Sequence, residues 1–347
     1  MNILIDINHP AHVHLLKHVI RLLKQHGHNV LVTVKDIPVA KRLLESEQIE
    51  YISVGGTKRD SLMGKACMQL KYNFLLWKLA VTNHIDLGVG SSVTIAHVSK
   101  FCKMKSVFLD DDDDKVEPLI AKYVHPFCDT VLSPEALREN RSTKHAVFYK
   151  GTHELAYLHP NRFTPNPDVL HSIGLSEGDP FFVMRFNAFK AHHDGNVQGL
   201  SLEQKLELVE LLKPHGKVLI TAERMIEPEL QSYQMTVSPE KVHDLLYYAT
   251  LFLGDSQTMT SEAAILGTPA FRCNTLVGQL SCIEDLEQHY GLAYGFLPSQ
   301  FPEMVQRITQ LLDNKDLKRE WHKKRQLFLS DKMDVTAFFV DYIEHYH

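Results

Sequence analysis

The chain has 347 residues, 44% hydrophobic and 23% charged, enough to bury the cores of two domains or of one large domain. Its formal net charge of -5 argues against a dedicated nucleic-acid binder, which needs a basic face to neutralise phosphates. No apolar run approaches the roughly 20 residues of a membrane-spanning helix, and the first apolar segment contains Asp6, unlike a secretory signal.

The five cysteines are scattered along the chain and form no CxxC pair. Such an odd, dispersed set is typical of reduced thiols, so we expect a cytoplasmic protein. The 21 histidines include no HExxH spacing. We therefore expect that the protein requires neither a divalent metal nor another cofactor.

Short apolar segments alternate with amphipathic ones, which predicts βα units and parallel sheets. Helices are expected between the strands, for example over residues 14–25 and 62–82. The strands expected in the first half are Ile3–Ile7, Val30–Val34, Tyr51–Val54, Leu87–Gly90, Val107–Leu109, Thr130–Leu132 and Ala146–Tyr149.

A second series of strands follows a proline-bearing stretch at residues 159–167, and from Phe301 onward the pattern is helical. These strands are expected at Phe181–Phe186, Val218–Thr221, Leu251–Leu253 and Ala270–Arg272. The fold class predicted is α/β, with two Rossmann-like parallel-sheet domains that face a cleft and a helical C-terminus. The domains expected are residues 1–158, residues 159–325, and a C-terminal helix over residues 326–347 that packs back on the first domain.

Ligands of such folds lie outside the carboxyl ends of the strands, so the loops there are the candidate sites. The first loop reads NHPAHVH, and His12 within it is a candidate general base because imidazole titrates near neutral pH. The alternative is simple helix capping by Asn8 or His9, with the other rings solvated.

Five consecutive aspartates, Asp110 to Asp114, follow another expected strand. A solvated acidic loop is a simpler interpretation of this run than a metal site. Asp110 and Asp111, nearest the strand end, are expected to face the cleft, and either is an alternative to His12 as the catalytic base.

Further candidates follow the strands of the second half. Arg185 is suited to a bidentate contact with a diphosphate. His192 and His193, in the loop after it, are expected to contact substrate or phosphate. Glu223, after the next strand, and His243, at the start of a helix, are expected to contact a nucleotide.

The segment Leu251 to Pro269, LFLGDSQTMTSEAAILGTP, reads as a strand, a tight loop and a short helix stopped by Gly267. The helix N-terminus can hold a phosphate through backbone N–H groups, with Ser256 and Thr258 as caps or further ligands. Glu262, one turn further in, is suited to accept ribose hydroxyls. The alternative is an ordinary join in which Glu262 complements the helix dipole.

The helix expected at residues 62–82 carries Lys65, Lys71 and Lys78 among large apolar side chains. Packing against the core with extended lysines is the favoured interpretation. Resting on a membrane surface is the alternative.

The segment GDSQTMTSEAAILGTP resembles the nucleotide-sugar diphosphate loop of the GT-B superfamily, which includes glycosyltransferases and non-hydrolysing UDP-N-acetylglucosamine 2-epimerases. The whole chain resembles more closely a bacterial and archaeal family of domains of unknown function within it. This resemblance rests on IDINHPAHVH, LSPE, YKGTHELAYLHPNRFTP, RFNAFKAHHDG and KVHDLLYYATLFLGDSQTMTSEAAILGTP.

The resemblance implies that Ser256, Gln257 and Thr258 bind the diphosphate and that Glu262 binds the ribose. It matches Arg185 to an arginine of the epimerases, and His12 to a histidine in the first loop of related glycosyltransferases. Gln257 and Thr258 replace the usual glycines here, as Pro10-Ala11 does in the first loop, so side chains narrow both loops.

The leading hypothesis is a glycosyltransferase that transfers a UDP-linked sugar to a glycan or lipid-linked acceptor in cell-surface polysaccharide biosynthesis, with peripheral membrane contact at the inner face as an option. The second is a UDP-sugar 2-epimerase or hydrolase, with the aspartate run, Glu117, His192 or His193 as acid and base. The third is a non-catalytic nucleotide-sugar binding protein.

Overall fold

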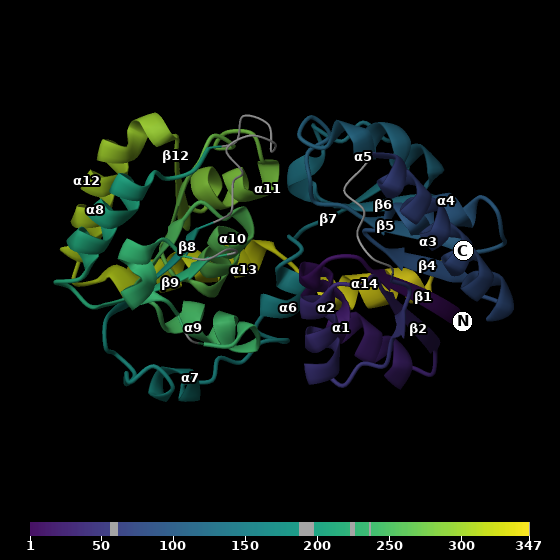
Figure 1. Ribbon diagram of the computed structural model, residues 1–347, viewed down its shortest axis with the longest axis horizontal. Coiled ribbons are helices and arrows are strands. Elements are labelled where there is room, and N and C mark those ends of the chain that lie inside the picture. The colour runs from purple at the N-terminus through teal and green to yellow at the C-terminus, as the bar shows by residue number, and fades with distance from the viewer. Residues whose placement is uncertain (56–61, 187–197, 223–225, 236, 347) are drawn as a thin grey trace. The chain divides into compact units, whose positions relative to one another are not determined.

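The structure is a computed structural model that describes residues 1–55, 62–186, 198–222, 226–235 and 237–346. The chain forms two compact units. Unit 1 comprises Met1–Arg162 and Met333–His347, and unit 2 comprises Phe163–Lys332. Each unit is built on one parallel sheet, as the alternating pattern predicts (Figure 1).

Unit 1 contains a seven-stranded sheet in the order β3-β2-β1-β4-β5-β6-β7. From β1 the chain adds β2 and β3 on one side of the sheet, and from β4 it adds β5, β6 and β7 on the other side. The strand order therefore reverses between β1 and β4. Their bounds are β1 Asn2–Ile7, β2 Asn29–Val34, β3 Ile52–Ser53, β4 Leu87–Gly90, β5 Lys105–Leu109, β6 Thr130–Pro134 and β7 Ala146–Tyr149.

Helices cover both faces of this sheet, because right-handed crossovers in opposite directions place them on opposite sides. One set packs around α1 and the other around α4. The first set is α1 Pro10–Gln25, α2 Pro38–Ser46, α6 Leu155–Leu158 and α14 Val335–Glu344; the second is α3 Leu62–Thr82, α4 Val93–Ser99 and α5 Pro118–Tyr123.

The last helix, α14, belongs to unit 1 although the chain reaches it only after unit 2. Phe339 packs edge-on against the Tyr149 ring at 5.3 Å between centroids, and the Thr336 hydroxyl donates to the Ala156 carbonyl at 2.7 Å. Val335 and Ile343 are also fully buried. This helix therefore completes the core of unit 1.

Unit 2 contains a five-stranded sheet in the order β12-β11-β10-β8-β9, so its strand order reverses between β8 and β10. The strands are β8 Phe181–Phe186, β9 Lys217–Ala222, β10 Leu251–Gly254, β11 Ala270–Cys273 and β12 Ala293–Phe296. The helices are α7 Asp168–His171, α8 Leu202–Leu212, α9 Val242–Tyr248, α10 Gln257–Leu266, α11 Ser281–Glu284, α12 Phe301–Leu312 and α13 Leu317–Asp331.

Every strand expected from the sequence is present, and β12 was missed. Its sequence, AYGF, is half-buried at the sheet edge and contains a glycine, so it lacks the continuous apolar run of a strand such as β10. No helix within the described ranges is both long enough and apolar enough to cross a membrane.

Glycine at the end of β4 allows the two central strands of unit 1 to approach closely. Gly90 has φ +149°, and a Cβ there would lie 2.7 Å from the Asp6 carbonyl oxygen of β1. Only glycine fits this position, where the strand order reverses and ligands of such sheets bind.

Candidate functional site

The loop after β1 places His12 in the first turn of α1. His9 is the N-cap, and its ring nitrogen accepts from the Ala11 backbone N–H at 3.2 Å, so the capping expected of this loop is confirmed for His9. His12 is half-buried, and no partner for its Nδ1 lies among the described residues. Burial, with the nearby charges of His9 and His153, lowers the pKa of His12 to about 3. Its ring is therefore neutral at physiological pH and has a nitrogen available to a ligand.

His153, in the loop after β7, forms an ion pair with Asp111 after β5. The distance from His153 Nδ1 to the Asp111 carboxylate is 3.0 Å. Burial lowers the pKa of His153, but the charge and hydrogen bond of Asp111 outweigh it and raise the pKa above its usual range. Burial conversely raises the pKa of Asp111, and His153 outweighs it and lowers that pKa. Both shifts favour the charged pair.

The pair leaves one ring nitrogen of His153 for other contacts. Its Nε2 is buried and has no hydrogen-bond partner in the described part of the chain. A buried polar atom without a partner is rare in native structures and indicates a bound group or water. Because Nδ1 is paired with the carboxylate, the Nε2–H of the charged ring is the donor that remains for a bound group.

Glu154 adds a carboxyl group that can exchange a proton near neutral pH. Its side chain is buried. Burial, and then the negative charge of Asp111, raise the pKa of Glu154 from 4.5 to about 7. We name His12, Asp111, His153 and Glu154 the histidine–carboxylate cluster. Carboxyl groups with such shifted pKa values are typical of general acids and bases.

Asp110, predicted as a catalytic candidate, is held by a histidine and an arginine. Its Oδ2 accepts from His125 Nε2 at 2.7 Å and from Arg141 Nη1 at 2.8 Å. The Arg141 guanidinium is fully buried and also donates to the backbone carbonyls of Asp110 and Asp112. This network fixes the loop and thereby the position of Asp111.

Three carboxylates of the aspartate run lie close enough to share a cation. Asp110, Asp111 and Asp112 each offer an oxygen within 4.8 Å of the others. Arg141 and His153 already neutralise two of these side chains. The donor set therefore does not require a metal to balance its charge.

In unit 2 the loop after β10 has the close approach and cap of an anion-binding turn. A Cβ on Gly254 would overlap the Arg185 carbonyl of β8, so this glycine lets the two strands meet where their order reverses. Ser256 is the N-cap of α10 and accepts from the Met259 N–H. Gly267 ends the helix with φ +90°, which confirms the predicted stop.

Gln257, the first residue of α10, is oriented by a buried arginine. Arg272 Nη1 donates to the Gln257 Oε1 at 2.9 Å, and the guanidinium is held in turn by Glu284 and Glu287. The Gln257 Nε2 is buried and has no partner within the described ranges. This donor and the free N–H groups of the first helical turn together suit an anion, whereas Thr258 is exposed.

Glu262 lies one turn further into α10 and is buried. Its Oε1 is 3.0 Å from His243 Nε2 of α9, so two predicted nucleotide contacts are brought together. Phe163 packs edge-on against the His243 ring. Arg185 is half-buried at the end of β8, where its Nη1 donates to the Thr221 hydroxyl at 3.1 Å.

Three predicted contacts, His192, His193 and Glu223, lie outside the described residues and remain predictions. The sequence analysis missed His153, Glu154 and Arg272 as site residues. The first two follow β7 at the carboxyl edge, where polar residues are expected to gather, so their position was a signal that could have been used.

The two α/β units, each with a parallel sheet, and the helical C-terminus give the chain a GT-B-like fold, and solved structures agree with this fold. The chain aligns with a UDP-GlcNAc 2-epimerase of Neisseria meningitidis bound to UDP-GlcNAc at a TM-score of 0.69 and 12% identity, over 99% of this chain and 100% of that one. SsfS6, a glycosyltransferase of Streptomyces sp. SF2575, aligns at 0.63 and 11% identity, over 99% and 100%. At such identities the likeness shows the fold.

The chain belongs to the family described as "Protein of unknown function (DUF354)", whose model matches residues 1–320. A relative is the uncharacterized protein MJ0665 of Methanocaldococcus jannaschii. It is 22% identical over 292 residues, which span 79% of this chain and 82% of the relative.

Proposed function

We propose that the protein is a glycosyltransferase that uses a UDP-linked sugar as donor and a glycan or a lipid-linked sugar as acceptor. The observation that carries this proposal is the turn at the start of α10, where the unpartnered Nε2 of Gln257 lies beside helical N–H groups. These donors suit a diphosphate, and they stabilise the charge of a departing nucleotide without a metal ion.

The remaining contacts of the donor are assigned from unit 2. Arg185 contacts the diphosphate, and Glu262 accepts hydroxyl groups of the ribose while His243 orients its carboxylate. His192, His193 and Glu223 are proposed to lie along the same nucleotide. Glu262 and Arg185 are already held by hydrogen bonds in the protein, so less conformational entropy is lost when the nucleotide binds.

The acceptor is activated from unit 1. His12 is neutral and has an unpartnered ring nitrogen, so it accepts the proton of the acceptor hydroxyl as the oxygen attacks the anomeric carbon. The negative charge of Asp111 stabilises the resulting imidazolium, because it opposes, in part, the lowering of the His12 pKa by burial and by the neighbouring histidines. Asp110 keeps Asp111 in place through Arg141. The reaction is placed in the cytoplasm, in the assembly of surface polysaccharide.

Calorimetry with UDP tests the donor site. Arg185→Ala and Glu262→Ala should each weaken UDP binding by about tenfold or more, because each removes a charged hydrogen-bonding group. Glu229→Ala, an exposed acid of the same unit, is the matched control. Unchanged affinity in both variants, with native circular dichroism, would overturn this placement. His12→Ala should abolish turnover and leave UDP affinity intact, and retained turnover would remove His12 from the role.

A second candidate is a UDP-sugar 2-epimerase or hydrolase, favoured by Glu154 and His153. These side chains place a carboxyl group with a pKa of about 7 next to a charged imidazole, which is the acid and base pair that proton exchange at C2 needs. Incubation with UDP-N-acetylglucosamine in deuterium oxide without an acceptor separates the two reactions. Deuterium at C2 supports the epimerase, and transfer to an added acceptor without exchange supports the transferase. UDP binding without either reaction would indicate a binding protein.

A further inference from the structure

The surface of unit 1 carries exposed apolar side chains over α3 and the elements next to it. On α3 they form one stripe, at positions 70, 74, 77 and 81, because this spacing repeats along one face of a helix. Leu70 is 68% exposed and Phe74 60%. The opposite side of α3 packs inward through Leu76 and Ala80. The helix therefore packs against the core as predicted, and in addition it exposes an apolar stripe on its outer side.

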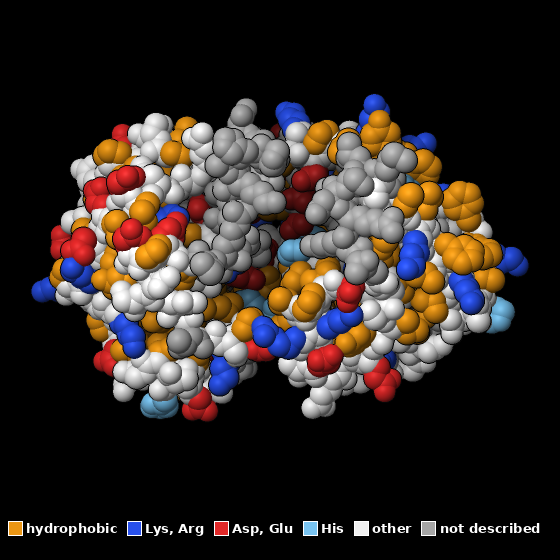
Figure 2. All heavy atoms as spheres, in the orientation of Figure 1, with side chains coloured by type: hydrophobic (Ala, Val, Ile, Leu, Met, Phe, Trp, Pro, Cys, Tyr) orange, Lys and Arg blue, Asp and Glu red, His pale blue; other side chains and the backbone are white. Residues whose placement is uncertain are grey.

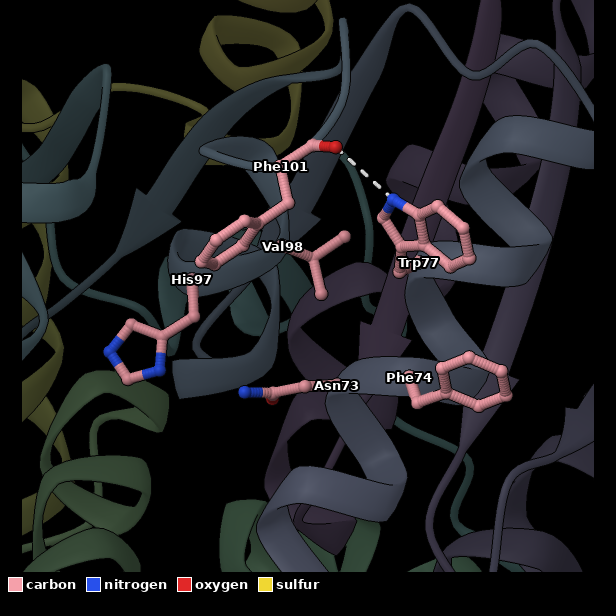
Figure 3. Close-up of a pocket in the computed structure, with 6 residues that line it drawn as sticks. All are labelled: Asn73, Phe74, Trp77, His97, Val98 and Phe101. Carbon is pink, nitrogen blue, oxygen red and sulfur yellow. Dashed lines mark hydrogen bonds between the residues drawn. The ribbon is translucent and has the colours of Figure 1, made fainter.

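Neighbouring elements extend this stripe into one continuous surface. The Trp77 indole N–H donates to the Phe101 backbone carbonyl at 3.1 Å, and the Phe101 phenyl ring, which points away from the indole, is 78% exposed (Figure 3). A cavity of about 380 Å³ opens here, lined by Phe74, Trp77, Phe101, Asn73, His97 and Val98. Figure 2 shows the apolar side chains that gather over this part of unit 1, with lysines among them.

Beyond this cavity the surface continues onto α5 and the short helix η1, His125–Phe127. His97 packs edge-on against Phe127 at 5.3 Å, and its Nε2 lies 3.0 Å from the Tyr123 carbonyl oxygen. Leu119 and Tyr123 are also exposed. We name the whole set the aromatic face; it comprises Leu70, Phe74, Trp77, Phe101, Leu119, Tyr123 and Phe127.

The charge around the part of the aromatic face that α3 and Phe101 form is positive. Between residues 62 and 109 the chain has six lysines and a single carboxylate, Asp86, which accepts from the Asn2 backbone N–H. Lys71 and Lys78 flank the stripe on α3 and are exposed, and Lys103 is exposed beside Phe101. Within the described ranges none of these three lysines forms an ion pair.

Two further lysines near this surface have an acidic neighbour. Lys100 and Lys105 both face Asp129, at 3.3 Å and 3.8 Å, and Glu117 is an exposed acid at the start of α5. The uncompensated positive charge is therefore concentrated on α3 and on the turn before β5. This part of the aromatic face is therefore cationic, although the protein has a net charge of -5.

We propose that the aromatic face binds the surface of a bilayer that contains anionic lipids. Tryptophan and tyrosine favour the level of the lipid headgroups, and leucine and phenylalanine reach into the acyl boundary. The lysines lie at the rim, where they attract anionic headgroups, whereas a docked protein would need carboxylates placed opposite them. The charge complementarity is what selects a membrane over a protein partner.

Trp77 makes this proposal directly measurable. The chain has two tryptophans, and Trp321 is fully buried in unit 2, so exposed tryptophan fluorescence comes from Trp77. Vesicles of phosphatidylcholine mixed with phosphatidylglycerol should shift the emission to the blue and protect Trp77 from acrylamide. Vesicles of phosphatidylcholine alone should do so much less. No nucleotide is present, so the result is independent of the proposed reaction.

Paired variants separate the two contributions. Lys71→Gln with Lys78→Gln should weaken co-sedimentation with the anionic vesicles about 25-fold, because each lysine near the surface contributes about a fivefold factor and the two factors multiply. Leu70→Gln with Phe74→Gln should remove the blue shift. The matched control is Leu327→Gln with Lys318→Gln on α13, an exposed apolar residue and an exposed lysine of unit 2.

The outcomes that overturn the proposal are equally specific. Binding that does not depend on phosphatidylglycerol, or that is equal in the aromatic-face variants and the control, would overturn it. A Trp77 that stays open to acrylamide on the vesicles would do the same. Self-association in the absence of lipid that the variants abolish would assign the surface to a second copy of the chain instead.

Discussion

At the scale of single residues, Glu154 offers a stability measurement on the histidine–carboxylate cluster. Its pKa is raised from 4.5 to about 7 by burial and by Asp111, so the folded state holds a proton that the unfolded chain releases. The stability from this group is complete below pH 4.5 and is lost as the pH rises through 7. Ionised Glu154 therefore costs the folded protein about 3 kcal/mol above that pH.

Replacing this carboxyl group with an amide should remove the pH dependence. In urea unfolding, the free energy of unfolding of Glu154→Gln minus that of the wild type should be about 3 kcal/mol larger at a pH above 7 than at pH 4.5. Glu50→Gln, at an exposed position of unit 1, should change the free energy of unfolding equally at all pH values. A constant difference for Glu154→Gln would show that this group has an ordinary pKa in the folded protein.

The residues of the site were predictable only in part. His12 was found because it follows an obvious strand and belongs to a loop rich in histidine. Glu154 was not found, because its pKa shift comes from burial by distant segments and from Asp111, 43 positions earlier in the printed sequence. Periodicity describes which face of an element is buried and carries no information about which charges the fold brings together.

At the scale of elements, Arg272 links β11 to the first turn of α10. It is fully buried and holds Glu284 of α11 and Glu287 of the π-helical turn η5, Asp285–His289, as well as Gln257. Arg272→Met should lower the free energy of unfolding by about 3–5 kcal/mol, because it leaves a buried carboxylate without a counter-charge. It should also weaken UDP binding, because Gln257 loses its orientation.

Two companion variants test this explanation. Arg319→Met removes an exposed ion pair with Asp316 and should change stability by less than about 1 kcal/mol. Adding Glu287→Gln to Arg272→Met should restore part of the loss, because the unpaired charge is then gone. Urea unfolding measures the effect on stability, and titration calorimetry measures the effect on UDP binding. If Arg272→Met had the same free energy of unfolding as the wild type, Arg272 would not link β11 to α10.

The sequence predicted the order of the strands and helices along the chain well. It predicted the edge strands, and what packs against each helix, less well. The central strand β10 is a continuous apolar run, and β1 is one apart from Asn2 and Asp6, as is typical of a sheet covered on both faces. β12 lacks such a run, and the exposed stripe of α3 is as apolar as its buried side, so hydrophobicity alone could not tell the two sides apart. Burial is set by what packs against a helix, and that is decided elsewhere in the chain.

At the scale of the whole molecule, the chain leaves unit 1 after Arg162 and returns to it at Met333. Deleting residues 333–347 removes α14, with its buried Val335, Phe339 and Ile343. Each such side chain contributes roughly 1.5–3 kcal/mol by burial, so unit 1 should melt at a lower temperature or not fold. Unit 2 should still bind UDP, because its site and core do not include this helix.

Differential scanning calorimetry measures the melting temperature of the shortened chain, and titration calorimetry measures its affinity for UDP. Asp341→Asn on the exposed side of α14 is the control and should leave the melting temperature unchanged. If the shortened chain lost UDP binding while unit 2 stayed folded, the assignment of the nucleotide site to unit 2 would be wrong.

The double passage between the units also has a meaning for evolution and for engineering. Because both ends of the chain belong to unit 1, unit 2 is topologically an insertion within it, a cassette bounded by two junctions at residues 162–163 and 332–333. A cassette can be exchanged without new termini. Replacing residues 163–332 with the equivalent segment of a relative should carry that relative's nucleotide preference into this chain, while His12 and Glu154 remain those of the host.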